Sequence, residues 1–260
     1  MATYKILFLG DIVGKPGREA VAKGLPKLVN DHRPEFVLVN GENSAAGLGI
    51  TPAIADELFG LGVDGITLGN HAFNKKEIYS YLDTGKMIVR PGNLPSTGVP
   101  GRGAMTIEKH GIRLLVLNLC GRVYMESYDD PFAEVNQILE KADTPHIFLD
   151  FHAEATSEKI AMGYHCEGRV SAVVGTHTHV TTADERVLPG GTAVITDVGM
   201  TGPVNSVLGM RKDIILGRFR TQMPARFEVA DESGVISGVV INVETSTGRA
   251  VGIQRVQWGE

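Results

Sequence analysis

The sequence has few cysteines and no long apolar run. Its 260 residues include two cysteines, Cys120 and Cys166, whose spacing matches no metal-binding motif. We therefore expect two reduced thiols in a cytoplasmic protein, not a disulfide framework. No apolar stretch approaches the roughly 20 residues needed to span a bilayer, and the apolar segment at residues 6–9 is too short for a secretory signal. These absences argue against a membrane-spanning or disulfide-stabilised protein.

An excess of positive charge is also absent. The net charge is −5, which argues against stable binding to nucleic acid or to a membrane surface. An anionic substrate is still compatible with this charge, because bound metal cations would dominate the field in their own site. Glycine is plentiful, with 32 residues, and many of them flank polar clusters where the backbone must turn sharply.

Short apolar strands alternate with helical patterns through most of the chain. The strands that this alternation predicts span residues 5–9, 36–40, 65–68, 114–119, 146–151, 170–174 and 193–196. The predicted helices span residues 18–29, 52–61, 75–82, 132–142 and 157–164. Thr51-Pro52 and Thr156-Ser157-Glu158 have the composition of helix starts, with a capping hydroxyl followed by proline or an acid.

Two segments predict antiparallel pairing within this α/β pattern. Residues 104–109 and 112–118 form a predicted hairpin around His110-Gly111. The tail predicts consecutive strands at 225–229, 238–243 and 250–258. An α/β first half and a β-rich second half favour two mixed sheets packed face to face with helices outside, in one domain spanning residues 1–260.

Polar clusters follow five of the apolar runs. They are Gly10-Asp11, Gly41-Glu42-Asn43, Gly69-Asn70-His71, Asp150-Phe151-His152 and Gly175-Thr176-His177-Thr178-His179. In α/β sheets, ligands bind beyond the carboxyl ends of the strands. Seven side chains there could ligate a metal: Asp11, Glu42, Asn43, Asn70, His152, His177 and His179.

This mixture of carboxylate, amide and imidazole groups is typical of sites for Mn, Fe or Zn. Seven ligands are too many for one four-coordinate ion. They suit two ions about 3.5–4 Å apart that share a bridging carboxylate, an arrangement used in phosphoester hydrolysis.

Three of these motifs resemble the calcineurin-like metallophosphoesterases. They are Gly-Asn-His at 69–71, the later strand-end His152 and the final Gly-x-His-x-His. The two polar clusters nearest the start of the chain depart from the pattern of that superfamily. Ile12-Val13 follows Asp11 where Asp-x-His is usual, and Gly41-Glu42-Asn43 stands where Gly-Asp-x-x-Asp is usual. With Gly10-Asp11-Ile12-Val13-Gly14 and residues 150–159, these variants resemble the bacterial YmdB-like branch from about Lys5 to Gly209.

The resemblance implies a four-layer αββα sandwich and a dinuclear centre with phosphodiesterase activity on cyclic nucleotides such as 2′,3′-cyclic AMP. It places Asp11, Glu42, Asn43 and His179 on one metal, and Glu42, Asn70, His152 and His177 on the other. His71 would be the general acid while a metal-bound hydroxide attacks phosphorus in line. Asn43 replaces an imidazole, which hardens its site. Fe or Mn is expected, with Zn as a further candidate, and the family is expected to form homo-oligomers.

Other functions fit the same motifs. A phosphomonoesterase or protein phosphatase could use the same centre, and a non-catalytic regulator could use the pocket to sense a nucleotide. The proton donor His71 weighs against a pure sensor.

Simpler roles exist for single residues. Asp11 could cap a helix, Asn43 and Asn70 could close turns, and His152 alone could be a core histidine. Asp150 and Glu154 are predicted to support the ligands or to lie at the surface.

Further residues have weaker signals. Arg18 could meet phosphate or solvent. Residues 200–206 are predicted to form a flexible loop near the pocket. Four histidines are predicted to be solvated: His32, His110, His146 and His165.

Overall fold

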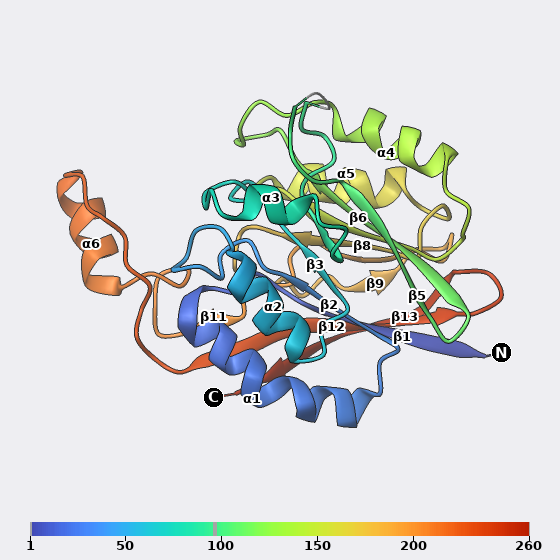
Figure 1. The fold of residues 1–260 in the computed structure, drawn as a ribbon, viewed down its shortest axis with the longest axis horizontal. Coiled ribbons are helices and arrows are strands. Elements are labelled where there is room, and N and C mark those ends of the chain that lie inside the picture. Colours follow the sequence, from blue (N-terminus) through green and yellow to red (C-terminus); the bar gives the residue numbers. More distant parts are fainter. Residues whose placement is uncertain (1, 96–97, 260) are drawn as a thin grey trace.

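The computed structural model describes residues 2–95 and 98–259, which form two β-sheets packed between two layers of helices (Figure 1). The first sheet has the order β11-β12-β1-β2-β3-β4, with β13 beside β12. Its strands are β1 (Thr3–Leu9), β2 (Phe36–Asn40), β3 (Gly65–Thr67), β4 (Ile88–Val89), β11 (Gly202–Pro203), β12 (Gly234–Glu244) and β13 (Ala250–Trp258).

The second sheet has the order β5-β6-β7-β8-β10-β9. Its strands are β5 (Ala104–Lys109), β6 (Ile112–Cys120), β7 (Ile147–His152), β8 (Ala172–Thr176), β9 (Arg186–Val187) and β10 (Ala193–Ile195). Both sheets are mixed: β1, β2, β3 and β4 run parallel while β12 is antiparallel to β1, and β5 is antiparallel to β6 at the edge of a parallel centre. The predicted hairpin is confirmed.

Alternating side chains on the strands build the layers. On β1, Ile6 and Phe8 belong to the core between the two sheets, whereas Leu7 and Leu9 belong to the core on the helix side. Across the inter-sheet core, the rings of Phe8 and Phe148 have centroids 5.1 Å apart. Because the central strands are apolar on both faces, each sheet must be covered twice, once by the other sheet and once by helices.

The described residues form six helices, and all of them except the last cover the two outer faces. They are α1 (Gly14–His32), α2 (Pro52–Gly60), α3 (Ile78–Leu82), α4 (Pro131–Glu140), α5 (Thr156–His165) and α6 (Lys212–Thr221). Residues of α1, α2 and α3 pack on the first sheet, and residues of α4 and α5 pack on the second. The predicted αββα sandwich is therefore confirmed.

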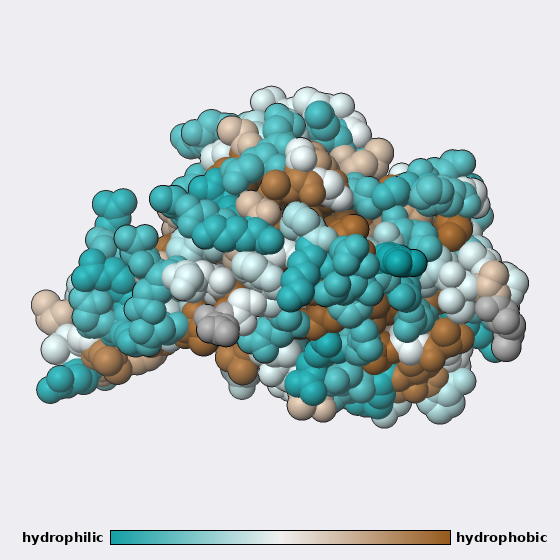
Figure 2. All heavy atoms as spheres, turned by 90° about the horizontal axis from the view of Figure 1, so that it is seen from below, coloured by the Kyte–Doolittle hydropathy of each residue, from teal (hydrophilic) through white to brown (hydrophobic). Residues whose placement is uncertain are grey.

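The segment between β11 and β12 differs most from the sequence prediction. Residues 225–229 are not a strand, since their one bridge joins Val229 to Met210. The preceding residues form α6, which the apolar pattern did not predict because Ile215 is the one residue of this helix that is buried. The helix projects from the body and carries hydrophobic atoms on its surface (Figures 1 and 2).

Residues 200–206 are a loop only in part, and Met200, Val204 and Ser206 line a pocket together with His179. Gly202 and Pro203 pair with β12, and Thr201 exchanges backbone hydrogen bonds with the segment after β1, from its N–H to Asp11 and from Val13 to its carbonyl, each 2.8 Å long. Thr201 is fully buried. The segment thus extends the first sheet and holds the strand exit that carries Asp11.

The helix-start predictions have mixed outcomes. Thr51 caps α2, since its Oγ1 accepts a hydrogen bond from the Ile54 N–H. Helix α5 begins at Thr156 with Glu158 in its first turn, which confirms the predicted start, but its N-cap residue is Ala155, so the predicted capping hydroxyl is wrong. Glu158 instead accepts backbone hydrogen bonds from Arg122 and Val123, and the helix turns this carboxylate inward to hold a separate loop.

His146 is not solvated as predicted. It is buried, and its Nδ1 lies 3.1 Å from the Tyr4 hydroxyl. Burial lowers the pKa of His146, so the neutral ring is favoured in the fold. Both cysteines are buried and free, as expected. Among the described residues, no helix combines the length and the apolar character that crossing a bilayer requires.

Candidate metal centre

The predicted ligands lie at the exits of strands from both sheets. Asp11 follows β1, Glu42 and Asn43 follow β2, and Asn70 follows β3. From the second sheet, His152 ends β7, and His177 and His179 follow β8. Because these strand ends of the two sheets lie at the same edge, residues more than a hundred positions apart, such as Glu42 and His152, come into contact.

Four side chains converge on one point. Ligand atoms of Glu42, His152 and His177 lie within 4.8 Å of one another. The Nε2 atom of His152 is 3.1 Å from Glu42 Oε1 and 3.1 Å from His177 Nδ1. It is also 3.0 Å from the Asn70 side-chain oxygen. One ring nitrogen carries at most one proton and cannot hydrogen-bond to all three neighbours, whereas two nitrogens and two oxygens suit one metal cation.

Each of the two histidines has a neighbour at one ring nitrogen, which leaves the lone pair of the other ring nitrogen directed toward this point. The Thr176 hydroxyl donates to Asp150, so it accepts from His152 Nδ1 at 2.8 Å and leaves Nε2 as the ligand nitrogen. Glu154 lies 3.2 Å from His177 Nε2, which leaves His177 Nδ1 toward the cluster. This arrangement is typical of metal-binding histidines. Asp150 and Glu154 thus lie where groups that support the ligands are expected.

Asp11 and Asn43 flank the cluster and carry oxygens without partners. Asp11 is fully buried, and its Oδ2 accepts a hydrogen bond from the His177 N–H, while its Oδ1 lies 3.8 Å from His152 Nδ1 and has no hydrogen-bond partner among the described residues. The Asn43 amide donates to Gly47, and its buried Oδ1 also has no partner there. Because buried polar atoms are normally paired, two buried oxygens without hydrogen bonds are available to a cation. Asp11 does not cap α1, whose N-cap residue is Val13.

His179 lies at the edge of the site. Its Nδ1 is 3.1 Å from the Leu208 carbonyl oxygen, so Nδ1 carries the proton and Nε2 keeps its lone pair. The structure therefore places Glu42, Asn70, His152 and His177 in direct contact. Asp11, Asn43 and His179 surround that group without joining its set of ligand atoms.

His71 is beside the cluster and outside it. Its backbone N–H donates to Glu42 Oε2 at 2.9 Å, and its ring Nε2 lies 3.4 Å from the Asn70 amide nitrogen. The ring is half-buried, so one side of it can reach solvent or a bound molecule. This position suits a proton donor better than a metal ligand.

The electrostatics of the cluster favour positive charge. Burial opposes ionisation of Glu42, but the neighbouring His152 outweighs it and holds the Glu42 pKa at about 2. Burial also disfavours the charged form of His152, yet the carboxylate of Glu42 raises its pKa to about 9. Burial and the charge of His152 lower the pKa of His177 to about 3, which keeps this imidazole neutral. His177 is therefore already in the neutral form that binds a metal, whereas a cation at this point would have to displace the proton of His152.

Two supporting residues escaped the sequence prediction. Asp197 follows β10 and accepts a hydrogen bond from Thr178 between the two histidines, and Lys159 of α5 pairs with it at 2.7 Å. The signal was available, because Asp197 follows an apolar run as Asp11 does. Arg18, by contrast, forms an ion pair with Glu57 of α2 through its Nη1, at 2.7 Å.

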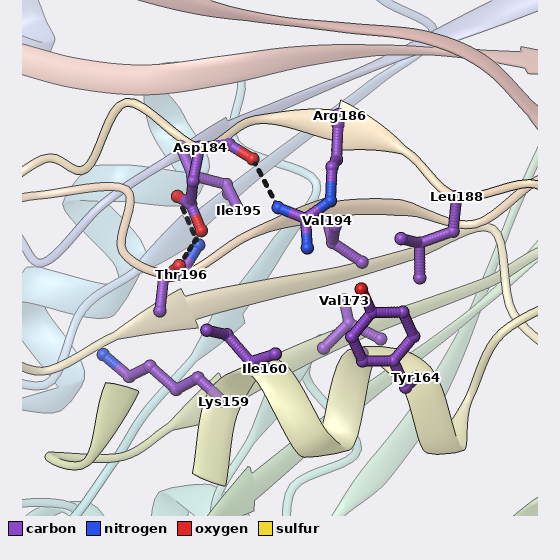
Figure 3. A pocket seen from close by; sticks show the side chains of 11 residues that line it. Lys159, Ile160, Tyr164, Val173, Asp184, Arg186, Leu188, Val194, Ile195 and Thr196 are labelled. Carbon is purple, nitrogen blue, oxygen red and sulfur yellow. Dashed lines mark hydrogen bonds between the residues drawn. The ribbon is translucent and has the colours of Figure 1, made fainter. Parts of the chain in front are cut away.

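A separate small cavity lies between α5 and strands β9 and β10 (Figure 3). Its walls include Tyr164, Asp184 and Arg186, and its volume is about 20 Å³. A space of that size holds about one water molecule. It is too small for a nucleotide, and the strand exits remain the place for chemistry.

Comparisons with known proteins identify the family of this chain. A family model described as YmdB-like protein matches residues 7–256. A 2′,3′-cyclic-nucleotide 2′-phosphodiesterase of Bacillus subtilis is 50% identical over 97% of this chain and 96% of its own. The crystal structure of a novel phosphatase from Mycoplasma pneumoniae has a TM-score of 0.94 and 33% identity, covering 99% of this chain and 94% of that one.

The crystal structure of a hypothetical protein from Thermus thermophilus has a TM-score of 0.92 and 40% identity, with 98% of both chains covered. The matches therefore span nearly the whole length of this chain and of its relatives. From the family match, these identities and the strand-exit cluster of Glu42, His152 and His177, we conclude that the chain belongs to the YmdB-like family of metallophosphoesterases and is a hydrolase of phosphate esters.

Proposed function

We propose that this protein is a dinuclear-metal phosphodiesterase that hydrolyses cyclic nucleotides, with 2′,3′-cyclic AMP as the representative substrate. The observation that carries the proposal is the convergence of Glu42, Asn70, His152 and His177 on one point, with the unpartnered oxygens of Asp11 and Asn43 beside it among the described residues. The name of the Bacillus subtilis relative supports the substrate class.

The ligand sets would share Glu42. One metal would be held by Asp11, Glu42, Asn43 and His179, and the other by Glu42, Asn70, His152 and His177. Glu42 would belong to both sets, and its two oxygens have different neighbours: Oε1 faces His152 and Oε2 accepts from the His71 N–H. Iron or manganese suits this mixed donor set, and zinc is the further candidate.

When bound, two such ions would polarise the phosphoryl oxygens and lower the pKa of water at the site. The chain's own residues do the rest. Asn70 places its side-chain oxygen 3.0 Å from His152 Nε2, and its amide donates to His71 Nε2, so it orients the imidazole of His71 and leaves His71 Nδ1 as the nitrogen that can carry a proton. In its protonated form, the ring of His71 would donate a proton to the leaving ribose oxygen.

The test is metal analysis of the purified protein followed by a substrate panel. We expect two metal ions per chain, loss of activity after chelation, and recovery on addition of Mn²⁺ or Fe²⁺. Turnover of 2′,3′-cyclic nucleotides should exceed that of phosphomonoesters. Full activity after complete chelation would contradict the metal centre. Preference for monoesters would favour a phosphatase, and tight nucleotide binding without turnover would favour a sensor.

We also propose that the protein forms a homo-oligomer through residues 211–228, called the arm here. The arm contains α6, and its exposed side chains include Leu216, Phe219, Met223 and Phe227. A helix of ten residues that buries one side chain is marginal in isolation. Exposed aromatic, methionine and arginine side chains are typical of the cores of protein interfaces.

Charge favours a second copy as the partner. The arm has five basic and two acidic residues, so its net charge is +3, and the rest of the chain carries −8 within a total of −5. This opposite net charge would attract the arm of one copy to the body of another. We expect Phe219→Asp to convert an oligomer to a monomer in analytical ultracentrifugation, while Tyr124→Asp, at a position 88% exposed elsewhere, leaves the oligomer intact. A monomeric wild-type protein at tens of micromolar would contradict this proposal.

A further inference from the structure

The histidine loop at residues 177–179 is held in an unfavourable backbone conformation. His177 has φ of 99° and His179 has φ of 65°, and both are non-glycine residues in the left-handed half of φ space. Few side chains adopt such angles unless surrounding contacts impose them. The loop carries two predicted ligands, one for each metal, so whatever imposes the angles also sets the ligand positions.

Asp197 supplies those contacts. Its Oδ2 accepts from the Thr178 N–H at 3.1 Å and from the Thr178 hydroxyl at 2.8 Å, midway between the two histidines. Its Oδ1 accepts from the Gly199 N–H at 2.8 Å. The backbone carbonyl of Asp197 also accepts from the Thr182 N–H at 3.0 Å. One residue therefore fixes the middle of the loop and the chain that leaves it.

Lys159 completes the arrangement from the other side. Its Nζ lies 2.7 Å from Asp197 Oδ2, and Lys159 and Asp197 are only 5% and 1% exposed. Its aliphatic stem lines the small cavity beside α5 (Figure 3). A side chain at Gly175 would collide with this stem and with the Thr196 carbonyl oxygen, so glycine is required where the stem passes. A buried carboxylate that loses its cation is strongly disfavoured, so the two charges depend on each other.

The ion pair also connects the two strand exits of the second sheet. Lys159 lies on α5, which begins four residues after His152, and Asp197 holds the loop that follows β8. We infer that the Asp197–Lys159 pair is a positioning device that holds His177 and His179 in ligating orientation for the two metals. This inference rests on the proposed function, because it presumes that both histidines bind metal.

The test uses Asp197→Asn, which keeps the shape of the side chain and removes its charge. The matched control is Asp64→Asn. Asp64 also accepts from a lysine, Lys109 at 2.9 Å, and from a backbone N–H, that of Val37, but it lies away from the strand exits. We expect Asp197→Asn to weaken Mn²⁺ binding about 10–100-fold, the usual effect of removing a group behind a metal ligand. Asp64→Asn should leave the Mn²⁺ affinity unchanged.

Three measurements separate positioning from stability. Mn²⁺ titration followed by electron paramagnetic resonance gives the affinity, and urea unfolding of the metal-free protein gives stability. Hydrogen exchange in the metal-free protein should accelerate at residues 177–179 in Asp197→Asn and Lys159→Met but not in Asp64→Asn. Wild-type Mn²⁺ affinity and wild-type exchange in Asp197→Asn, with only a lowered unfolding midpoint, would overturn the inference.

The outcome for the proposed function is separate. A wild-type protein that binds no Mn²⁺, Fe²⁺ or Zn²⁺ contradicts the metal centre itself. In that case the exchange measurement still decides whether Asp197 and Lys159 hold the loop, because it requires no metal. Excess Mn²⁺ provides a further check: it should restore most of kcat in Asp197→Asn, as expected for displaced ligands, and a loss of kcat that no metal concentration relieves would overturn the positioning role.

Discussion

Replacing Glu42 by glutamine is expected to lower phosphodiester turnover by at least about 10²–10³-fold, the effect of removing one electrostatic partner of a transition state. Glu42 is 1% exposed, and each of its oxygens is directed to a different neighbour. Glutamine keeps the shape but can accept at only one of the two positions, so it cannot bridge two cations. Metal content per chain and turnover of bis-p-nitrophenyl phosphate are the measurements.

Glu158→Gln is the matched control for this change. Glu158 is also a buried carboxylate that accepts backbone hydrogen bonds, from Arg122 and Val123, and it is not one of the converging ligands. The Glu158→Gln variant should have a lower free energy of unfolding than the wild-type protein and an unchanged metal content per chain. Undiminished turnover in Glu42→Gln, with unchanged metal content, would exclude a bridging role and with it the dinuclear arrangement.

The sequence predicted the architecture well because the layers arise from local alternation. On β1 and β7, neighbouring apolar residues face different cores, and such runs are visible without knowledge of tertiary structure. In α/β sheets ligands bind beyond the carboxyl ends of the strands, and this rule predicted from the sequence that Glu42, Asn70, His152 and His177 lie together. The rule does not distinguish the members of the set from one another. The structure does, because Asp11, Asn43 and His179 lie around the converging group without joining its set of ligand atoms.

The failures share a physical cause, which is that their outcome depends on a remote partner. His146 is buried because the Tyr4 hydroxyl is available on a strand more than a hundred residues away. Arg18 is paired because α2 presents Glu57 to it. The composition of a short segment does not contain such contacts. Asp197 is different, because it followed an apolar run and satisfied the same rule as the other strand-exit residues.

Helix α6 illustrates the opposite limit. Hydrophobic periodicity identifies a helix through its buried face, and α6 buries one residue among those described. The sequence of α6 therefore shows no apolar stripe of the kind that packs a helix against the rest of its own chain. If a second copy covers the arm, the exposed apolar side chains of α6 are buried in an interface between two chains and not in the core of one chain.

Replacing His71 by alanine is expected to slow hydrolysis of a 2′,3′-cyclic nucleotide by about 10²–10⁴-fold, the usual contribution of a general acid. The change leaves metal binding intact, because it is the backbone N–H of His71, and not its ring, that contacts Glu42. The loss should be much smaller for bis-p-nitrophenyl phosphate, since p-nitrophenolate leaves without taking up a proton. Steady-state kinetics on both substrates, with metal analysis of each preparation, makes the comparison.

Chemical rescue distinguishes a missing proton donor from a disturbed site. Removal of the imidazole leaves space beside Asn70, whose amide lies 3.4 Å from the ring nitrogen of His71. Added imidazole should therefore accelerate the alanine variant on the cyclic nucleotide, and it should have little effect on the nitrophenyl ester. An equal loss for both substrates, or full metal loss in the variant, would contradict proton donation. The contribution of His71 would then lie in holding Asn70 and, through it, the metal ligands.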